Sequence, residues 1–456
     1  MYKKRKKIFK IIRYSLISIF IFIVSLVCLG VIFYASGYKV NWKAKKIEKT
    51  GMLLITTKEN GFRVFIDKKE TKVFHNRGIN IFENIYKLPI LPGEYDVEIK
   101  KEGSKTYFQR IKIEPELITR IESVLLLPES ITEDSIFEEK ILKYSISPNG
   151  KKFFYQLSED RKYYLYDIEK NEKIPIEIIN PKFETKRIDW SKDSENILIE
   201  KIDSEKKTNY FLIKTREIKN SYLVSDRLSF LPSLEKLYLS PKKSDEFFGL
   251  DKDNILYKIN TQQNTTDIVE VDIKGFFENK DYVFFLDKKN DLIKMDANTY
   301  LKEIILERFE VFDDFKIISL NSNIFFINNK SLFYIKDKNN LELIEKDTES
   351  LYQENNNRGF FYTNGFEIWY YDRTKKIKTM LTRFSKEIKD LQEFYEYKYL
   401  VYQQGTDLNL IKKDGLFTQS INNNIENIKV FDKNKILILE KLNDKTILRI
   451  LDPETN

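Results

Sequence analysis

Residues 14–38 carry no charged side chain, and most of them are aliphatic or aromatic. A helix rises about 1.5 Å per residue, so about 20 apolar residues cross the hydrocarbon core of a bilayer. The segment therefore predicts a single transmembrane helix over residues 14–36, with the rest of the chain on one side of a membrane. A cleaved signal peptide is the alternative, although the apolar run is longer than the usual signal core and lacks a clean pair of small residues at its end.

The basic residues on the two sides of this segment differ in number. The tail of residues 1–13 has seven of them, whereas residues 39–49 have five lysines and one glutamate. Because basic flanks stay in the cytoplasm, we predict a single-pass plasma-membrane protein with a cytoplasmic tail and an extracytoplasmic bulk. The lipid bilayer is thus a predicted partner, and residues 37–50 are a predicted juxtamembrane linker. The predicted interface anchors are Arg13, Tyr14, Tyr34, Tyr38 and Trp42.

The formal net charge of +8 belongs to these membrane flanks. The first 13 residues carry +7 and residues 39–49 carry +4, so residues 50–456 carry −3. A nucleic-acid-binding domain usually has a cluster of Lys and Arg on one face, and no such cluster stands out in the body of the chain. We therefore predict no nucleic-acid partner.

Cysteine and histidine are nearly absent. Cys28 lies within the apolar segment and His75 is the only histidine, so counting excludes a disulfide within the chain, zinc sites of the Cys/His kind and Cys–His nucleophile pairs. A Ser-His-Asp triad would need His75, which stands in a polar stretch and is predicted to be a surface loop residue. We predict no catalytic residues, no cofactor and no metal ligands.

Residues 51–128 predict a small all-β unit. Short runs of alternating apolar and polar residues are separated by turns, a pattern typical of strands that bury one face. Residues 72–86 are expected to form a less regular connection. The expected strands are residues 51–57, 62–67, 95–99, 107–113 and 118–125.

Three motifs carry a resemblance in this unit. They are Gly51-x-Leu53-x-Ile55-x-Thr57, Gly61 followed by Val64-Phe65-Ile66-Asp67, and Leu91-Pro92-Gly93-Glu94-Tyr95-x-Val97-x-Ile99 leading to Glu102-Gly103. In them the unit resembles the PEGA domain, a small β-sandwich of bacterial and archaeal surface proteins. It departs from that pattern where Lys58-Glu59-Asn60-Gly61 replaces the name-giving tetrapeptide and where Ser104 replaces a frequent tyrosine. The resemblance implies a surface or spacer role without catalysis.

Residues 129–456 contain a repeat. Apolar strands and polar turns recur roughly every 35 to 50 residues, a period typical of a β-propeller whose four-stranded blades stack around an axis. We count eight blades, although seven are possible because the third and fourth copies are hard to divide. A strand from Ser135 to Leu142 is expected to complete the last blade and close the ring. The copies begin near Tyr144, Ile188, Lys236, Ile273, Ile317, Leu351, Asp390 and Ile428.

The first two copies carry a turn motif. It reads Ser147-Pro148-Asn149-Gly150 in the first copy and Trp190-Ser191-Lys192-Asp193 in the second. In these residues the repeat resembles TolB-type, WD-like propellers, whose repeat has Trp-Ser-Pro-Asp-Gly before a strand. The second copy lacks both the Pro and the Gly, and later copies lose the motif. The resemblance therefore implies the fold and says little about function.

Several groups resemble functional sites but have simpler interpretations. Asp251-Lys252-Asp253-Asn254 begins like a calcium loop but lacks its later ligands, so a hairpin turn is expected. Asp189, Asp193 and Glu195 could be a carboxylate pair, but we expect them on a turn, where Asp bonds its own backbone. Aromatic runs could stack on glycans, although packing between blades is the expected role. The runs are Tyr163-Tyr164, Phe284-Phe285, Phe325-Phe326, Phe360-Phe361 and Trp369-Tyr370-Tyr371.

Two functions remain open for an all-β chain with one transmembrane helix. The first is a membrane-tethered binding or scaffold protein, with a propeller that meets a protein or glycan partner of the cell envelope, and it is the one that we predict. The second is an extracytoplasmic hydrolase or lyase with a site in the propeller channel. Carboxylates on successive innermost strands would favour the enzyme, and the sequence offers only Asp189 as a candidate.

Overall fold

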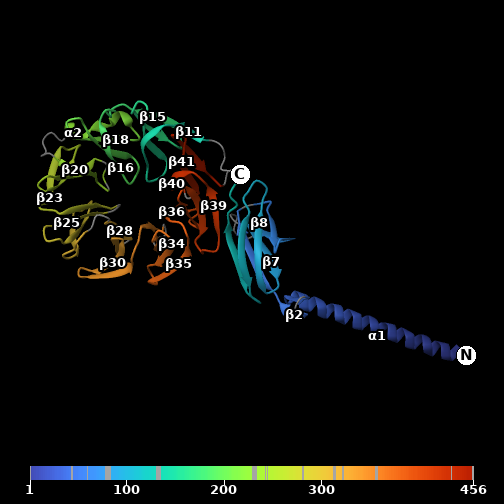
Figure 1. Cartoon of the computed structure of the whole chain (residues 1–456). Coiled ribbons are helices and arrows are strands. Elements are labelled where there is room, and N and C mark those ends of the chain that lie inside the picture. Colours follow the sequence, from blue (N-terminus) through green and yellow to red (C-terminus); the bar gives the residue numbers. More distant parts are fainter. Residues whose placement is uncertain are drawn as a thin grey trace. The chain divides into compact units, whose positions relative to one another are not determined.

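The computed structural model describes residues 2–42, 45–58, 60–77, 84–129, 135–227, 234–241, 243, 245–279, 282–311, 315–320, 323–354, 358–432 and 434–453. In this part of the chain, strands dominate and one long helix stands at the N-terminus (Figure 1). The predicted all-β class is therefore confirmed. The chain divides near residue 130 into two compact units, which are described separately.

The N-terminal helix α1 (Tyr2–Ala35) contains the apolar segment. Its stretch Arg13–Ala35 has 23 residues with a mean hydropathy of 3.1, and none of it is buried against the rest of the protein. A helix therefore covers predicted residues 14–35, although it begins earlier, at Tyr2. By length and composition this helix can cross a membrane, while the orientation of the chain stays a prediction.

The first unit continues with a hairpin and a β-sandwich. The hairpin, which lies in the predicted linker, pairs β1 (Tyr38–Asn41) with β2 (Lys46–Lys49). The sandwich has two four-stranded sheets, in the orders β10-β3-β7-β6 and β5-β4-β8-β9. Its strands are β3 (Gly51–Thr57), β4 (Arg63–Ile66), β5 (Lys69–Thr71), β6 (Phe74–Arg77), β7 (Asn84–Ile90), β8 (Gly93–Lys100), β9 (Tyr107–Ile113) and β10 (Ile118–Val124).

The alternation in the sequence explains this sandwich. Along β9, every second residue from Tyr107 to Ile113 is buried and the residues between them are exposed. Residues 72–86 were expected to be irregular, but they supply β6 and the start of β7. His75 was expected in a loop, and this was wrong because it lies in β6 opposite Tyr86. Its polar neighbours hid the strand, since an edge strand needs no apolar run.

The second unit consists of eight four-stranded sheets among its described residues. We call them blades 1 to 8, in the order of their first strands. Blade 1 consists of β12 (Ile141–Ile146), β13 (Lys152–Leu157), β14 (Tyr163–Asp167) and β15 (Glu172–Ile176), and blade 2 of β16 (Glu184–Trp190), β17 (Asn196–Ile202), β18 (Thr208–Lys214) and β19 (Tyr222–Leu223). Blade 3 consists of β20 (Leu234–Leu239), β21 (Glu246–Asp251), β22 (Leu256–Asn260) and β23 (Thr265–Glu270), and blade 4 of β24 (Gly275–Glu278), β25 (Tyr282–Leu286), β26 (Leu292–Asp296) and β27 (Lys302–Leu306).

The other four blades follow the same pattern, and two short helices, η1 (Ile218–Asn220) and α2 (Val224–Arg227), lie after β18. Blade 5 consists of β28 (Lys316–Leu320), β29 (Asn323–Asn328), β30 (Ser331–Asp337) and β31 (Asn340–Glu345), and blade 6 of β32 (Ser350–Gln353), β33 (Gly359–Thr363), β34 (Glu367–Asp372) and β35 (Ile377–Arg383). Blade 7 consists of β36 (Ile388–Phe394), β37 (Tyr399–Gln404), β38 (Asp407–Lys412) and β39 (Thr418–Asn422), and blade 8 of β40 (Ile425–Phe431), β41 (Lys435–Leu442), β42 (Lys445–Leu451) and β11 (Ser135–Glu139).

These blades form a propeller. Figure 1 shows the first strand of a blade, such as β16, β28, β36 or β40, nearer the centre of the ring than its last strand. Each copy that we expected from the sequence begins at or beside such an innermost strand. Blade 8 is completed by β11 from the start of the unit, which pairs with β42 through Phe137 opposite Leu448. The predicted closure is confirmed, although β11 ends at Glu139 and the residues after it begin blade 1.

Apolar side chains fill the space between neighbouring blades. Blade 1 packs against blade 2 through Phe154 and Ile197, and against blade 8 through Phe153 and Leu437. All four of these side chains have 0% of their surface exposed. The aromatic runs of the sequence lie mainly in such clusters, so the expectation that they pack between blades is confirmed.

The turn motif of the first two copies has the same geometry in both. The Gly150 N–H donates to the Ser147 carbonyl oxygen at 2.8 Å, and the Ser194 N–H donates to that of Ser191 at 2.9 Å. Gly150 has a φ of 72° and Ser194 a φ of 63°. A Cβ at Gly150 would lie 2.5 Å from the Cβ of Phe431 in blade 8. Glycine is therefore required in the first copy, whereas the second turn tolerates serine.

Candidate functional site

The innermost strands of five consecutive blades share an irregularity near their start. The pairing register shifts in β36, β40, β12, β16 and β20, so that the innermost strand has one residue more than its partner. Such β-bulges redirect a side chain and are common beside functional sites. The side chains at these bulges are exposed, and each lies near the start of its innermost strand. We call the set the bulge arc: Asp390, Glu426, Leu142, Lys186 and Glu235.

Blades 7 and 8 make one end of the arc acidic. Asp390 is exposed to solvent, yet burial by the surrounding protein raises the pKa of its carboxyl group, against the opposing charge of Lys389. The carboxyl group thus reaches solvent while protein atoms around it disfavour its charged form. Burial likewise raises the pKa of Tyr144 on β12, and the charges of Glu426 and Asp390 add to that effect. The Tyr144 hydroxyl accepts a hydrogen bond from Asn427 Nδ2 at 3.3 Å.

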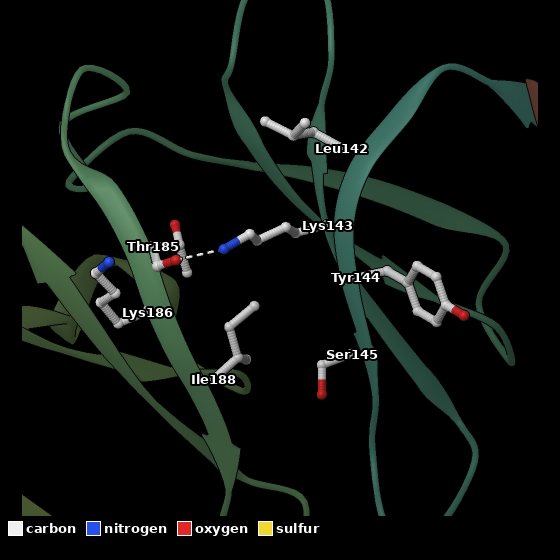
Figure 2. Close-up of a pocket in the computed structure, with 7 residues that line it drawn as sticks. All are labelled: Leu142, Lys143, Tyr144, Ser145, Thr185, Lys186 and Ile188. Atoms are coloured by element: carbon white, nitrogen blue, oxygen red, sulfur yellow. Dashed lines mark hydrogen bonds between the residues drawn. The ribbon is translucent and has the colours of Figure 1, made fainter. Parts of the chain in front are cut away.

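Blades 1 and 2 make the next part of the arc basic. An open pocket of about 300 Å³ lies between the innermost strands β12 and β16 (Figure 2). Lys143 reaches across it and donates a hydrogen bond to the Thr185 carbonyl oxygen, and Trp190 Nε1 donates to Ser145 Oγ at 3.0 Å. The lining contains no carboxyl, imidazole or thiol group, and its residues are Leu142, Lys143, Tyr144, Ser145, Thr185, Lys186 and Ile188.

A buried lysine lies behind this pocket. The Lys201 ammonium is fully inaccessible and donates to the Tyr163 hydroxyl oxygen and to the Asn180 carbonyl oxygen, both at 2.8 Å. Tyr163 in turn hydrogen-bonds the Thr185 hydroxyl group. Burial, together with the nearby charge of Lys143, lowers the pKa of Lys201 to about 7. Lys201 therefore contributes less positive charge to the pocket as the pH rises above neutral.

Asp189 is held by an arginine. We expected Asp189 on a turn, and this was wrong, because the residue lies within β16 and only Asp193 and Glu195 are in the turn. Arg187 Nε lies 2.8 Å from Asp189 Oδ2 and 3.3 Å from Glu200 Oε2. Burial raises the pKa of Asp189, while the charge of Arg187 opposes that shift. The carboxyl group belongs to an ion-pair network at the contact of blades 2 and 3.

A second acidic group was not found from the sequence. Lys413 Nζ lies 3.2 Å from Glu354 Oε1 and contacts Glu393, whose side chain is 0% exposed. Tyr370 donates a hydrogen bond to Glu354 at 2.9 Å. Glu393 lies one residue before the end of β36, and Asp189 has the same position in β16. Three groups separated by up to 59 residues meet here, so no local signal could reveal them.

Other predicted residues have simple positions. Asp251 ends β21 and its carboxylate accepts hydrogen bonds from the N–H groups of Asp253 and Ile255, which confirms the hairpin turn. Of the predicted anchors, Arg13, Tyr14 and Tyr34 lie on α1, Tyr38 begins β1 and Trp42 follows β1. No group of three or more His, Cys, Asp or Glu side chains suited to a metal ion occurs among the described residues.

Comparison with known proteins adds little to this geometry. No protein-family model matches the chain, and no curated protein sequence matches it. Among solved structures, the chain is similar to the dihydro-heme d1 dehydrogenase NirN (13% identity, TM-score 0.43, covering 62% of this chain and 66% of that one). It is also similar to the C-terminal WD40 domain of Sif2 (12% identity, TM-score 0.44, covering 69% of this chain and 97% of that one). A third similar structure is that of a eukaryotic initiation factor (12% identity, TM-score 0.47, covering 73% of this chain and 91% of that one). At these values the likeness says nothing about ligand or activity.

Proposed function

We propose that this protein is a membrane-tethered binding or scaffold protein that works outside the cytoplasm, with no enzymatic activity of its own. The partner is a protein or a glycan of the cell envelope, and the bulge arc is its docking surface. The sandwich, with its resemblance to PEGA domains, is a spacer between the bilayer and the propeller. In this scheme α1 is a retained signal anchor with its basic tail in the cytoplasm.

One observation carries the proposal. Five consecutive blades present exposed side chains of both charge signs at bulges near the start of their innermost strands. A wide rim of this kind matches the polar rim that protein interfaces use, where charges select the partner and set the association rate. The acids farther inside are engaged, because Asp189 pairs with Arg187, and Glu354 and Glu393 pair with Lys413.

Photo-crosslinking in intact cells tests the docking surface. A photoreactive phenylalanine replaces Leu142, which is 50% exposed on the bulge arc, and in a matched variant it replaces Leu416, which is 62% exposed in the turn between β38 and β39. We expect a discrete adduct from position 142 that is absent at position 416. An equal yield at both positions, or no adduct at position 142, would contradict the proposal.

A second function deserves a test because of two acids. Asp390 and Glu426 stand on the successive innermost strands β36 and β40, and both act on the pKa of Tyr144. Paired carboxyl groups with different environments are the usual machinery of glycan hydrolysis. If the protein is a hydrolase or lyase, turnover of a glycan or peptide by the purified chain will fall at least 100-fold in both Asp390→Asn and Glu426→Gln. Turnover that survives both changes would exclude these acids.

A further inference from the structure

The hairpin that follows α1 has one exposed apolar face. In the register of β1 and β2, Val40 lies directly opposite Ile47, and side chains of directly paired residues share a face of the sheet. Val40 is 47% exposed and Ile47 is 59% exposed. Trp42, at the turn of the same hairpin, is 84% exposed. Three apolar side chains thus stand in solvent on an element of only two short strands.

The opposite face of the hairpin is polar and bonded to the sandwich. Lys39 and Glu48 form the neighbouring cross-strand pair, and Lys39 Nζ donates a hydrogen bond to the Pro89 carbonyl oxygen in β7 at 2.7 Å. At the base of the hairpin, the Thr50 N–H donates to the Gly37 carbonyl oxygen at 2.8 Å. The polar face therefore has partners within this unit. On the apolar face, Lys49 at the base of the hairpin pairs with Glu116 and Tyr38 contacts Phe33, whereas Val40 and Ile47 nearer the turn remain exposed.

Chain length keeps this apolar face close to the bilayer. Only two residues separate the end of α1 at Ala35 from the start of β1 at Tyr38. An extended chain spans at most about 3.5 Å per residue, so Val40 lies within about 18 Å of the helix end. The headgroup layer itself is about 5–8 Å deep on each side of the hydrocarbon core. A hairpin lying along the surface therefore reaches the layer where tryptophan and tyrosine side chains are enriched.

We propose that the hairpin β1–β2 docks on the lipid headgroup layer, with Val40, Trp42 and Ile47 inserted. The sandwich is bonded to the hairpin, so docking holds the sandwich at the membrane surface. This inference rests on the proposed membrane tether, because it assumes that α1 spans the bilayer.

The test uses the full chain reconstituted in phosphatidylcholine–phosphatidylglycerol vesicles. Cys28, the only cysteine, lies in α1 and reports insertion through its protection from a membrane-impermeant maleimide. Lipids brominated near the carbonyl end of the acyl chain report depth by quenching tryptophan fluorescence. We expect quenching in the wild type that is lost in Trp42→Phe and at least halved in Val40→Asp with Ile47→Asp.

The controls distinguish docking of the hairpin from insertion of α1 in the membrane. Leu416→Asp, at an exposed apolar residue of the propeller, is expected to leave the quenching unchanged. Protected Cys28 without Trp42-dependent quenching would overturn the docking and leave the tether intact. A Cys28 that the maleimide labels without detergent would overturn the tether and the docking together.

Discussion

Lys201 gives the propeller a pH-dependent stability that can be worked out. Burial lowers the pKa of its ammonium group from 10.5 to about 7. One pKa unit equals about 1.4 kcal/mol, so the charged form costs the folded state about 5 kcal/mol. In the unfolded chain the group keeps its ordinary pKa and binds a proton more tightly. Stability therefore rises with pH between about 7 and 10.5 and is pH-independent below that window with respect to this group.

The perturbation is Lys201→Met, which removes the titrating group and keeps most of the side-chain volume. Between pH 6 and pH 9, Lys201 should add about 2–3 kcal/mol to the free energy of unfolding of the wild type. This gain should be missing in Lys201→Met. The free energy of unfolding of this variant at pH 6 also depends on the hydrogen bonds lost at Tyr163 and Asn180. The decisive quantity is the difference in slope.

The assay is urea unfolding of the full chain in mild detergent at pH 6, 7.5 and 9, followed by tryptophan fluorescence. Trp190 and Trp369 lie in the propeller and report its unfolding. Lys219→Met, at an exposed lysine, is the matched control and should keep the wild-type slope. Identical slopes for the wild type and Lys201→Met would refute the reasoning, because the pKa of Lys201 would then be equal in the folded and unfolded states.

Three further changes address packing and charge, each measured by urea unfolding at pH 7.5. Lys413→Met leaves Glu354 and Glu393 without their cation and should cost about 3–5 kcal/mol. Phe137→Ala removes the ring that lies between blades 8 and 1 and should cost about 2–4 kcal/mol. Gly150→Ala forces a Cβ against blade 8 at a positive φ and should cost about 1–3 kcal/mol.

Conservative controls sharpen these three expectations. Lys413→Arg keeps the charge and should recover most of the loss, while Phe137→Leu keeps much of the apolar volume and should cost less than alanine. Gly405→Ala isolates the backbone effect, because Gly405 has a φ of 58° and nothing within 4 Å of an added Cβ. If Gly405→Ala proves as costly as Gly150→Ala, the contact with Phe431 has no role.

Much of the fold could be predicted from local patterns. An uncharged apolar run marks a helix, and alternation with a period of two marks a strand, because each pattern fixes which side chains leave water. The eight copies and the strand at residue 135 followed from a recurring period, which reflects blades that cannot be stable alone. The prediction failed at His75, because the edge strand β6 contains polar residues. It also failed at Asp189, because this charged residue lies within a strand, one residue before its end.

The sequence alone therefore determined the apolar N-terminal helix, the strand-rich bodies and the blade repeat, since each depends on burial and backbone geometry within a short window. Only the tertiary structure decided which side chains meet. Asn427 contacts Tyr144 across a separation of 283 residues because closure of the ring places blade 8 beside blade 1. The bulge arc is likewise a property of the ring, because a register shift in one strand acquires neighbours only when five blades stand side by side.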